Sequence, residues 1–290
     1  MPIARVWSLT FLAMLAFAGN SLLCRVALKN TSIDAASFTA VRLMSGAAAL
    51  WLIAHMQRGA QPGRGNWPSA LALFVYAAGF SFAYVMLPAA TGALLLFGAV
   101  QATMIGRGLW QGDRLTRLQL AGFVLAIAGL VGVLLPGLST PPLAGSLLML
   151  SAGIAWGIYS LRGQGAGNPI QVTAGNFLRA APIAAGLAGF TVLGHQGASV
   201  DATGLALAVA SGAVTSGIGY AIWYSALPSL KTTQAATVQL SVPVLAALGG
   251  TAFLNEAITL RFVLASVAIL GGILLVIQDK QRVDNLRQGR

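Results

Sequence analysis

Residues 216–276 read SGIGYAIWYSALPSLKTTQAATVQLSVPVLAALGGTAFLNEAITLRFVLASVAILGGILLV, in which two long apolar runs follow a segment rich in Tyr and Trp. A related sequence occupies residues 76–135, which read YAAGFSFAYVMLPAATGALLLFGAVQATMIGRGLWQGDRLTRLQLAGFVLAIAGLVGVLL. Phe80 of the earlier stretch falls on Tyr220 of the later one at a spacing of 140 residues. A long internal repeat of this kind decides the fold and therefore has to be identified first.

The repeat extends on both sides of this aromatic position. The other paired positions are Tyr84 and Tyr224, Pro88 and Pro228, Asp113 and Glu256, Gly129 and Gly272 and, further upstream, Arg42 and Arg179. The spacing is 140 residues around the aromatic positions, 143 in the later part and 137 in the upstream part. We therefore expect two units of about 140 residues each, the first over 1–138 and the second over 139–290.

The composition predicts a membrane protein. Hydrophobic residues make up 57% of the chain and charged residues 8%, and the mean hydropathy is +0.80. Soluble domains carry roughly 25% charged residues, so this chain could not cover a soluble globular surface with polar groups. In a soluble protein the net charge of +11 would suggest nucleic acid, but in a membrane protein Lys and Arg mark cytoplasmic loops. We expect no nucleic-acid partner.

The sequence gives no sign of a metal or cofactor site. One cysteine, Cys24, excludes an intramolecular disulfide. Two scattered histidines, His55 and His195, cannot form a convincing zinc site with it. We expect neither a metal nor a cofactor.

Ten stretches are long and apolar enough to be expected as membrane-spanning helices, each of which needs about 20 mostly apolar residues. The stretches are Val6–Leu28, Ser37–Met56, Trp67–Leu87, Ala89–Leu109, Leu118–Leu135, Leu143–Leu161, Ile170–Leu193, Leu205–Leu227, Gln234–Leu254 and Leu260–Ile277. Gly- and Pro-rich segments separate them. The fold class is therefore an all-α integral membrane protein.

The distribution of Lys and Arg predicts the orientation. With the N-terminus in the cytoplasm, twelve basic residues of loops and helix ends lie inside and three lie outside. The three outer ones are Arg25, Lys29 and Arg261. We therefore expect a multi-pass protein of the bacterial inner membrane with both termini cytoplasmic.

Combining the repeat with the orientation predicts a functional class. A unit of five helices is an odd number, so the second copy must cross the membrane in the opposite direction. Inverted-topology repeats are typical of secondary transporters, which bind substrate near the membrane midplane between the two halves. We expect ten helices arranged as two inverted five-helix repeats around a central cavity, with a small molecule as the partner.

Aromatic side chains at helical spacing are the first candidates for the walls of that cavity. Tyr76, Phe80 and Tyr84 share one face of the third helix, and Tyr220 and Tyr224 share one face of the eighth. Two such stripes would present flat apolar walls with hydroxyl groups for orientation. The alternatives are an aromatic belt at the membrane–water interface or plain packing.

Further candidates are polar or aromatic residues at membrane depth, where polar groups need partners. These are Phe17 and Asn20 in the first helix, Gln101 in the fourth, Trp156 and Tyr159 in the sixth, and Gln239 in the ninth. Such groups either face water and substrate or bond to neighbouring helices. Pro243, within the expected ninth helix, is the candidate hinge.

Two arginines, Arg42 and Arg179, lie within expected helices. Arginine at the bilayer centre costs about 2.5–3.5 kcal/mol on insertion scales, which favours a position facing a cavity or a cluster of carbonyl groups. Arg179 could receive a substrate carboxylate, because a guanidinium matches a carboxylate with two hydrogen bonds. For Arg42 we favour either a snorkelling side chain or a role in tying helices together.

Acidic residues are confined to loops and helix ends. Exporters of cationic drugs and proton pumps usually use a buried carboxylate. The sequence therefore does not support a carboxylate proton relay, and it leaves open whether transport is coupled to protons.

The two repeated segments resemble the EamA domains of the drug/metabolite transporter superfamily. In that family each domain ends with a Pro-containing helix, a Glu-containing turn and a Gly-rich last helix. Residues 255–259, Asn-Glu-Ala-Ile-Thr, match the turn, whereas residues 112–116 depart from it by Asp113 in place of Glu. The resemblance implies ten helices, an inverted repeat and transport of small organic metabolites, very often export of amino acids. It also implies a structural role for Glu256, and the aromatic candidates resemble those of the aromatic amino acid exporters.

Three functional classes are candidates for an apolar chain of this kind. The first is a secondary transporter that exports amino acids, aromatic or otherwise neutral, by alternating access. The second is a multidrug or lipid-like transporter on the same fold. The third is an intramembrane enzyme, for which a serine protease would need a Ser/His pair, often with a G-x-S-x-G turn that the chain lacks.

Overall fold

The computed structural model describes residues 3–56, 65–112, 115–135, 140–163, 168–194, 199–230 and 238–288, and within these ranges it is built from helices with no strand. The helices are α1 (Ile3–Asn30), α2 (Ala35–Met56), α3 (Trp67–Met86), α4 (Ala89–Trp110), α5 (Arg117–Leu134), α6 (Leu143–Gly163), α7 (Pro169–Gly194), α8 (Ala202–Val209), the π-helix η1 (Ala210–Ile218), α9 (Gly219–Ala226), the short 3₁₀-helix η2 (Leu227–Ser229), α11 (Ser241–Leu254) and α12 (Leu260–Gln288). Because α8, η1 and α9 follow one another without a break and form one long helix, the ten expected helices are confirmed.

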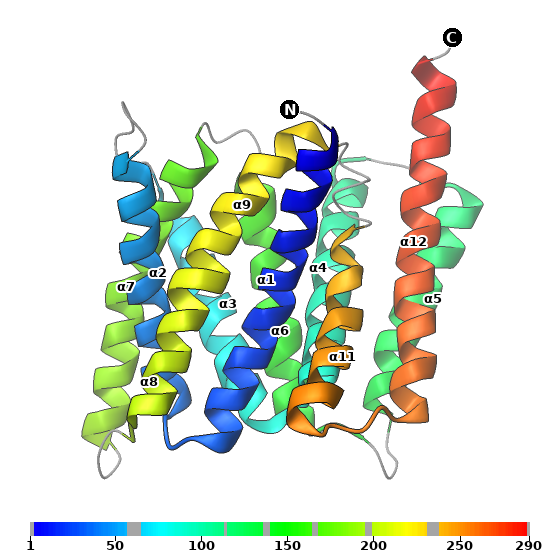
Figure 1. Ribbon diagram of the computed structural model, residues 1–290. Coiled ribbons are helices and arrows are strands. Elements are labelled where there is room, and N and C mark those ends of the chain that lie inside the picture. Colours follow the sequence, from blue (N-terminus) through cyan, green and yellow to red (C-terminus); the bar gives the residue numbers. More distant parts are fainter. Residues whose placement is uncertain are drawn as a thin grey trace.

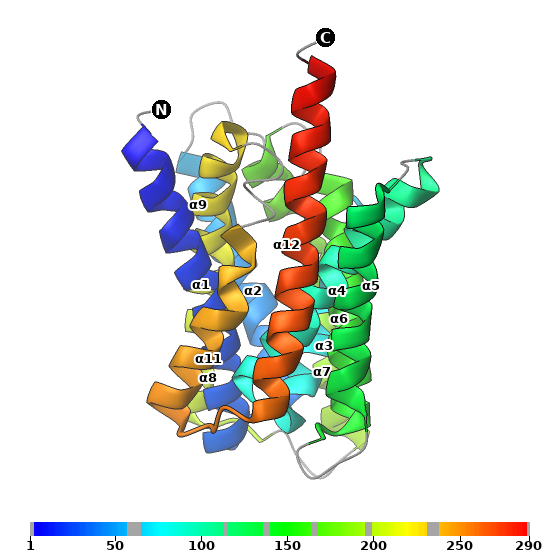
Figure 2. The same cartoon turned by 90° about the vertical axis from the view of Figure 1, so that its right-hand side faces the viewer.

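The helices stand side by side in one bundle (Figures 1 and 2). The first described residues of α1 and the last of α12 lie at the same end, which we call the terminal end; the other is the opposite end. Within the described residues, eight helical spans are long and apolar enough to cross a membrane, and Arg117–Gly132 and Ser241–Leu254 are shorter apolar helices. The protein is therefore a multi-pass membrane protein.

The outer surface of the bundle is apolar. Large apolar side chains point outward along most helices, and Leu193, Phe190 and Phe253 are 90%, 76% and 77% exposed. A soluble monomer rarely exposes large contiguous apolar patches, whereas lipid tails make such a surface favourable. Inside the bundle, buried polar side chains such as Asn20, Ser211 and Thr215 bond to one another.

The helices pair in a pattern that recurs between the two halves of the chain. α5 packs mainly on α12, and α2 packs mainly on α7, so the fifth and tenth and the second and seventh helices are neighbours. The contact of α3 with α6 has its counterpart in the contact of α9 with α1, and that of α4 with α6 has its counterpart in α11 with α1. Two equivalent halves would produce this pattern; the division at residue 138 and the inverted orientation remain our proposal.

Two aspartates at the opposite end begin helices. The carboxylate of Asp34 accepts the backbone N–H of Ser37 at 2.9 Å in the first turn of α2, and that of Asp201 accepts the N–H of Gly204 at 3.3 Å in the first turn of α8. Partial burial opposes ionisation of Asp201, yet its hydrogen bonds from Gly204 and Ser32 hold its pKa below the usual value. Both residues thus act as N-caps, which satisfy backbone donors that a helix start leaves free.

Glycine allows the closest helix contacts. A Cβ added to Gly212 in η1 would lie 2.0 Å from Ser45 Oγ and 2.1 Å from the carbonyl oxygen of Arg42 on α2. At the crossing of α5 and α12, a Cβ on Gly122 would lie 2.5 Å from the Gly272 carbonyl oxygen. Small faces of this kind let helix backbones approach closely in membranes, so α2 with η1 and α5 with α12 depend on the missing side chains.

We expect Gly212→Ala to destabilise the bundle by about 1–3 kcal/mol, because the added methyl group overpacks the α2–η1 contact. The measurement is thermal unfolding of the purified protein in detergent. Gly106→Ala in α4 is the matched control, since a Cβ there meets nothing within 4 Å and alanine has the higher helix propensity. An equal melting temperature for Gly212→Ala and the wild-type protein would contradict the expected overpacking.

Candidate functional site

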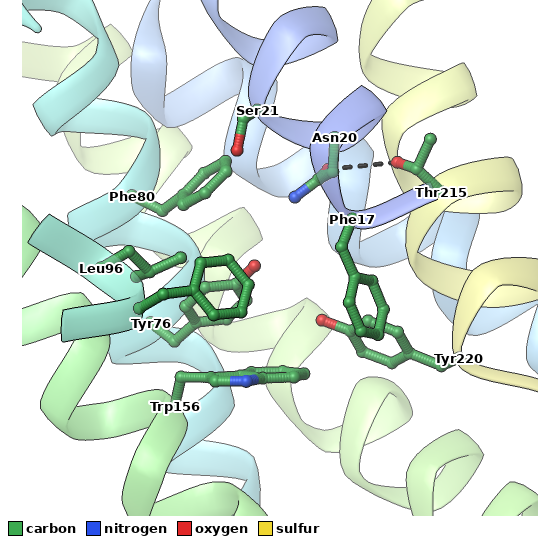
Figure 3. A pocket seen from close by; sticks show the side chains of 10 residues that line it. Phe17, Asn20, Ser21, Tyr76, Phe80, Leu96, Trp156, Thr215 and Tyr220 are labelled. Carbon is green, nitrogen blue, oxygen red and sulfur yellow. Dashed lines mark hydrogen bonds between the residues drawn. The ribbon is translucent and has the colours of Figure 1, made fainter. Parts of the chain in front are cut away.

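A cavity lies near the middle of the bundle, between α1, α3, α4, α6 and the long helix formed by α8, η1 and α9 (Figure 3). Its walls are formed by Phe17, Asn20, Ser21, Tyr76, Phe80, Leu96, Phe97, Trp156, Thr215 and Tyr220. The volume in which the centre of a water molecule could lie is about 20 Å³, room for a single water molecule or little more. A larger ligand therefore requires side chains or helices to move apart.

Half of the twelve residues expected at the substrate site meet in this cavity. They are Phe17, Asn20, Tyr76, Phe80, Trp156 and Tyr220. They come from α1, α3, α6 and α9, so segments far apart in the sequence supply one site.

Aromatic rings form a continuous wall around Trp156. Its ring lies 4.7 Å from that of Tyr76 and 5.2 Å from that of Tyr220, between centroids. Phe17 meets Tyr220 edge-on at 5.8 Å. Offset and edge-on arrangements at these distances are favourable for aromatic pairs. The wall thus offers flat faces suited to an apolar or aromatic group, and ring faces also attract cations.

Asn20 forms the polar side of the cavity. Its Oδ1 accepts hydrogen bonds from Ser211 Oγ at 2.7 Å and from Thr215 Oγ at 3.2 Å. Figure 3 shows its amide nitrogen pointing into the cavity, with the hydroxyl of Tyr220 on the same side of the space. The two bonds fix the amide so that its N–H groups face the cavity.

The partners of Asn20 come from the π-helix η1, where the sequence predicts only one regular helix over Leu205–Leu227. η1 carries Ser211, Thr215 and Ser216, and all three are buried. π-helical turns are rare and occur frequently at functional sites. The wider turn lets Ser211 and Thr215 reach Asn20 while Ser216 reaches Arg42.

Arg42 is buried beside the aromatic wall, with 1% of its surface exposed. Its Nε donates to Ser216 Oγ at 3.3 Å and its Nη2 donates to the Tyr76 hydroxyl at 3.0 Å. The guanidinium carbon lies 4.8 Å from the centre of the Phe80 ring and 5.2 Å from that of Tyr76. Within the described residues Nη1 has no hydrogen-bond partner, and Arg42 forms no ion pair.

Tyr159 and Tyr224, two further candidates, lie at a second cavity nearer the terminal end. Ser69, Arg162, Gly163, Val172, Thr173 and Asn176 complete its walls. Asn176 Nδ2 donates to the Tyr159 hydroxyl at 3.5 Å, and Arg162 Nε donates to Ser69 Oγ at 3.0 Å. This second cavity lies between the central cavity and the terminal end, and polar and apolar groups share its walls.

Four other candidates lie outside the walls of both cavities. Tyr84 is fully buried, meets the Phe80 ring edge-on at 4.6 Å and donates its hydroxyl to the Ala89 carbonyl at 3.3 Å. Gln101 is buried in α4 and Gln239 is half-buried before α11. Arg179 is half-buried, and its Nη1 donates to the Gly175 carbonyl one turn earlier on α7. We expect these side chains to act through packing.

Pro243 lies in the first turn of α11, just after the turn at Leu240. A proline is well tolerated there, because the first backbone N–H groups of a helix have no partner within it. The helix expected over Gln234–Leu254 is thus interrupted at Leu240, three residues before the proline, and residues 231–237 lie outside the described ranges. The hinge remains a prediction, now placed at the start of α11.

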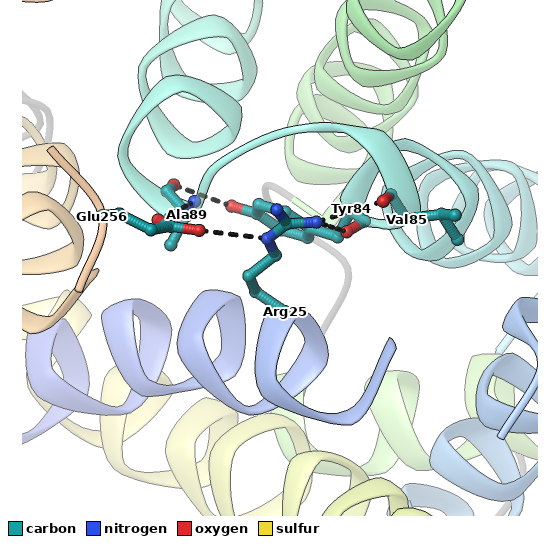
Figure 4. Close-up of polar contacts among 5 residues, drawn as sticks. All are labelled: Arg25, Tyr84, Val85, Ala89 and Glu256. Carbon is teal, nitrogen blue, oxygen red and sulfur yellow. Dashed lines mark hydrogen bonds and ion pairs between the residues drawn. The ribbon is translucent and has the colours of Figure 1, made fainter. Parts of the chain in front are cut away.

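A polar network joins the helix ends at the opposite end of the bundle (Figure 4). Arg25 Nε pairs with Glu256 Oε1 at 3.0 Å, and Arg25 Nη1 donates to the carbonyl oxygens of Tyr84 and Val85 at 2.8 and 3.1 Å. Glu256 Oε2 accepts the N–H of Ala89 at 2.7 Å. The end of α3, the start of α4, α1 and the loop before α12 are therefore tied together, which explains why this turn needs a glutamate.

The sequence did not reveal that Arg42 lies against Tyr76 and Phe80, and it did not single out Thr215 as a wall residue. Arg42 offered a signal, a charged residue inside an apolar helix, which does not reveal the side chain's partners. Thr215 offered none, because Ser and Thr are common in membrane helices and bond to their own backbone.

The chain matches the model of the EamA-like transporter family twice, over residues 5–135 and 143–278. It is 58% identical over 281 residues to the uncharacterized protein PA1977 of Pseudomonas aeruginosa, which covers 97% of each chain. It is 38% identical to the threonine/homoserine exporter RhtA of Salmonella typhimurium (51% of this chain, 50% of the relative) and 36% identical to that of Escherichia coli K12 (56% and 57%). A crystal structure at 19% identity has the same fold, with a TM-score of 0.64 over 94% of this chain and 97% of that one.

The Arg25–Glu256 pair leads to a stability prediction. We expect Arg25→Ala and Glu256→Ala each to destabilise the protein by about 3–5 kcal/mol, because each leaves a mostly buried charge unpaired. The double variant is expected to lose less than the sum, with a coupling of about 1–3 kcal/mol. Unfolding in detergent measures all three. Arg107→Ala, at an exposed position on α4, is the control and should change stability by less than about 0.5 kcal/mol. If the stability losses of Arg25→Ala and Glu256→Ala simply add in the double variant, a direct interaction between the two residues is contradicted.

Proposed function

The chain belongs to the EamA-like transporter family, and from this premise we propose that it is a secondary transporter that exports amino acids, aromatic or otherwise neutral, across the inner membrane. The observation that carries the proposal is the central cavity, which combines an aromatic wall with fixed polar groups. Cavities for small molecules are mostly apolar with a few placed polar groups. Both halves of the chain contribute to this cavity: the first half supplies α1, α3 and α4, and the second half supplies α6, η1 and α9.

We place the terminal end of the bundle in the cytoplasm. Among the described basic residues, Arg5, Arg107, Arg117 and Arg162 lie in helix turns at that end, whereas Arg25, Lys29 and Arg261 lie at the opposite end. Cytoplasmic loops carry the excess of Lys and Arg. Export then runs from the terminal end to the opposite end.

The geometry supports alternating access as the mechanism. The Arg25–Glu256 network ties the helix ends on the expected outer side, while the second cavity lies between the central cavity and the cytoplasmic side. A substrate would enter past Tyr159 and Tyr224, and export would require the outer network to separate. Rigid-body movement of one half against the other around a central site is the usual route in such repeats.

The named relatives favour amino acids as the substrate class. The similarity to the threonine/homoserine exporters spans about half of each chain. An amino acid also suits the central cavity: its side chain would lie against the aromatic wall, and its ammonium group would meet ring faces, which attract cations. The amide of Asn20 would donate a hydrogen bond to the carboxylate of the amino acid.

A multidrug or lipid-like transporter is the second candidate, favoured by the breadth of the aromatic wall alone. Aromatic faces can hold cationic drugs. Within the described residues, however, no carboxylate lines either cavity, and the buried charge beside the central cavity is positive. This arrangement favours substrates with a negative group.

The proposal predicts counterflow in proteoliposomes. Proteoliposomes that contain the purified protein and are preloaded with an unlabelled amino acid should take up labelled threonine, methionine or phenylalanine. Phe80→Ala and Tyr220→Ala should each reduce this uptake about tenfold or more, because each opens a gap in the wall that positions the substrate.

Phe190→Ala is the matched control, since this ring is 76% exposed on the outer surface of α7 and should leave uptake unchanged. Absence of counterflow for every amino acid would overturn the proposed substrate class. Drug and lipid-like substrates would then be tested on the same vesicles.

A further inference from the structure

We propose that Arg42 is the residue that binds the substrate's carboxylate, so that the transporter selects molecules with a free carboxylate and rejects their amides and the corresponding amines. The proposal rests on the proposed function and deepens it, because it assigns the negative group of the substrate to one side chain. The sequence favoured Arg179 for this role and a snorkelling or helix-tying role for Arg42.

The buried charge of Arg42 is the first feature that supports carboxylate binding. The Arg42 guanidinium is 1% exposed and, in the part of the chain that the structure describes, no acidic side chain pairs with it. The carboxylates whose side chains the structure describes are committed elsewhere: Asp34 and Asp201 cap helices, Glu256 pairs with Arg25, and Asp279 accepts a hydrogen bond from Thr116 Oγ1. Buried charges are normally paired and hydrogen-bonded, so Arg42 lacks the counter-charge that its burial calls for.

An unused hydrogen-bond donor of Arg42 is the second supporting feature. A guanidinium has five N–H donors in a fixed planar fork. Nε and Nη2 are used by Ser216 and Tyr76, whereas Nη1 has no partner within the described residues. A residue that only tied helices together would be expected to use this nitrogen as well, because an unmade hydrogen bond in a buried site costs about 1–3 kcal/mol.

The position of Arg42 next to the walls of the central cavity is the third supporting feature. Tyr76 and Phe80, whose rings lie directly against the guanidinium, are themselves walls of the central cavity. The Tyr76 hydroxyl that accepts from Arg42 points toward the cavity in Figure 3. The proposal therefore requires these two rings to move aside so that the free Nη1 can reach a ligand in the cavity.

The fourth supporting feature is a second hydrogen-bond donor in the cavity wall, the amide of Asn20. Asn20 presents an amide donor, and a carboxylate accepts hydrogen bonds from guanidinium and amide groups alike. The ammonium group of an amino acid would lie against the rings of Phe17, Trp156 and Tyr220. Arg42 and Asn20 would thus bind one pole of the substrate and the aromatic wall the other.

Arg179 is a poorer candidate on the same criteria. It is half-buried rather than fully buried, lies outside the walls of both cavities and donates to the carbonyl group of Gly175 on its own helix. The two repeat-related arginines therefore differ in environment, and only Arg42 lies against the central cavity's walls.

The test compares four probes on purified protein: L-phenylalanine, L-phenylalaninamide, phenethylamine and 3-phenylpropanoate. Binding is measured by thermal shift and by competition with counterflow of labelled phenylalanine and labelled threonine. We expect phenylalanine and 3-phenylpropanoate to bind, and the amide and the amine to bind about tenfold or more weakly, since a charged hydrogen bond is lost.

Arg42→Gln should remove this preference for the acid over the amide, and Arg42→Lys should retain part of it. Arg107→Gln, which makes the same charge change at an exposed position on α4, should keep it. If Arg42→Gln does not fold, the acid-to-amide comparison in the wild-type protein and in Arg42→Lys still decides the matter, because a purely structural arginine would not affect that ratio.

The outcomes separate the two proposals. If the amide competes as well as the acid while amino acids show counterflow, the assignment of Arg42 is overturned and amino acid export stands. If the acids bind through Arg42 and no amino acid shows counterflow, export is overturned and the carboxylate site stands. If none of the four probes binds and no counterflow occurs, both are overturned.

Discussion

Every polar group inside this bundle must find its partner within the protein, because the outer surface is apolar and lipid offers no hydrogen bonds. This constraint explains why the interior polar side chains occur in connected groups. Asn20 bonds to two hydroxyl groups of η1, and Arg25 bonds to Glu256 and two carbonyl groups. Two buried side-chain atoms have no hydrogen-bond partner among the described residues, Ser266 Oγ and Arg42 Nη1, and the second belongs to a charged group that lies beside the central cavity.

The π-helix and the close helix crossing act together to build the site. Gly212 lets η1 approach the backbone of α2, which brings Ser216 within reach of Arg42. The wider π turn also directs Ser211 and Thr215 toward α1. A regular α-helix of the same sequence would turn these side chains by a different angle per residue. Local backbone geometry and helix packing therefore position the polar half of the cavity, while the aromatic half follows from side-chain spacing on α3 and α9.

The structure divides the twelve site residues predicted from the sequence according to depth and face. Six line the central cavity and two line the second cavity. Tyr84 faces the packed α3–α4 turn instead, although it shares a helical stripe with Tyr76 and Phe80, because it lies one turn closer to the opposite end. Helical periodicity identifies a common face, but the depth at which neighbouring helices separate decides which residues on that face meet a cavity.

The sequence by itself determined the membrane class, the ten helices and the family, because hydropathy, length and a long repeat are properties of the chain read in one dimension. It also indicated the aromatic positions of α3 and α9. Only the tertiary structure decided that Arg42, rather than Arg179, lies against the central cavity's walls, and that Glu256 ties α1 to the turn between α3 and α4. The physical reason is that these roles depend on contacts between residues some 34 to 231 positions apart, which no local pattern records.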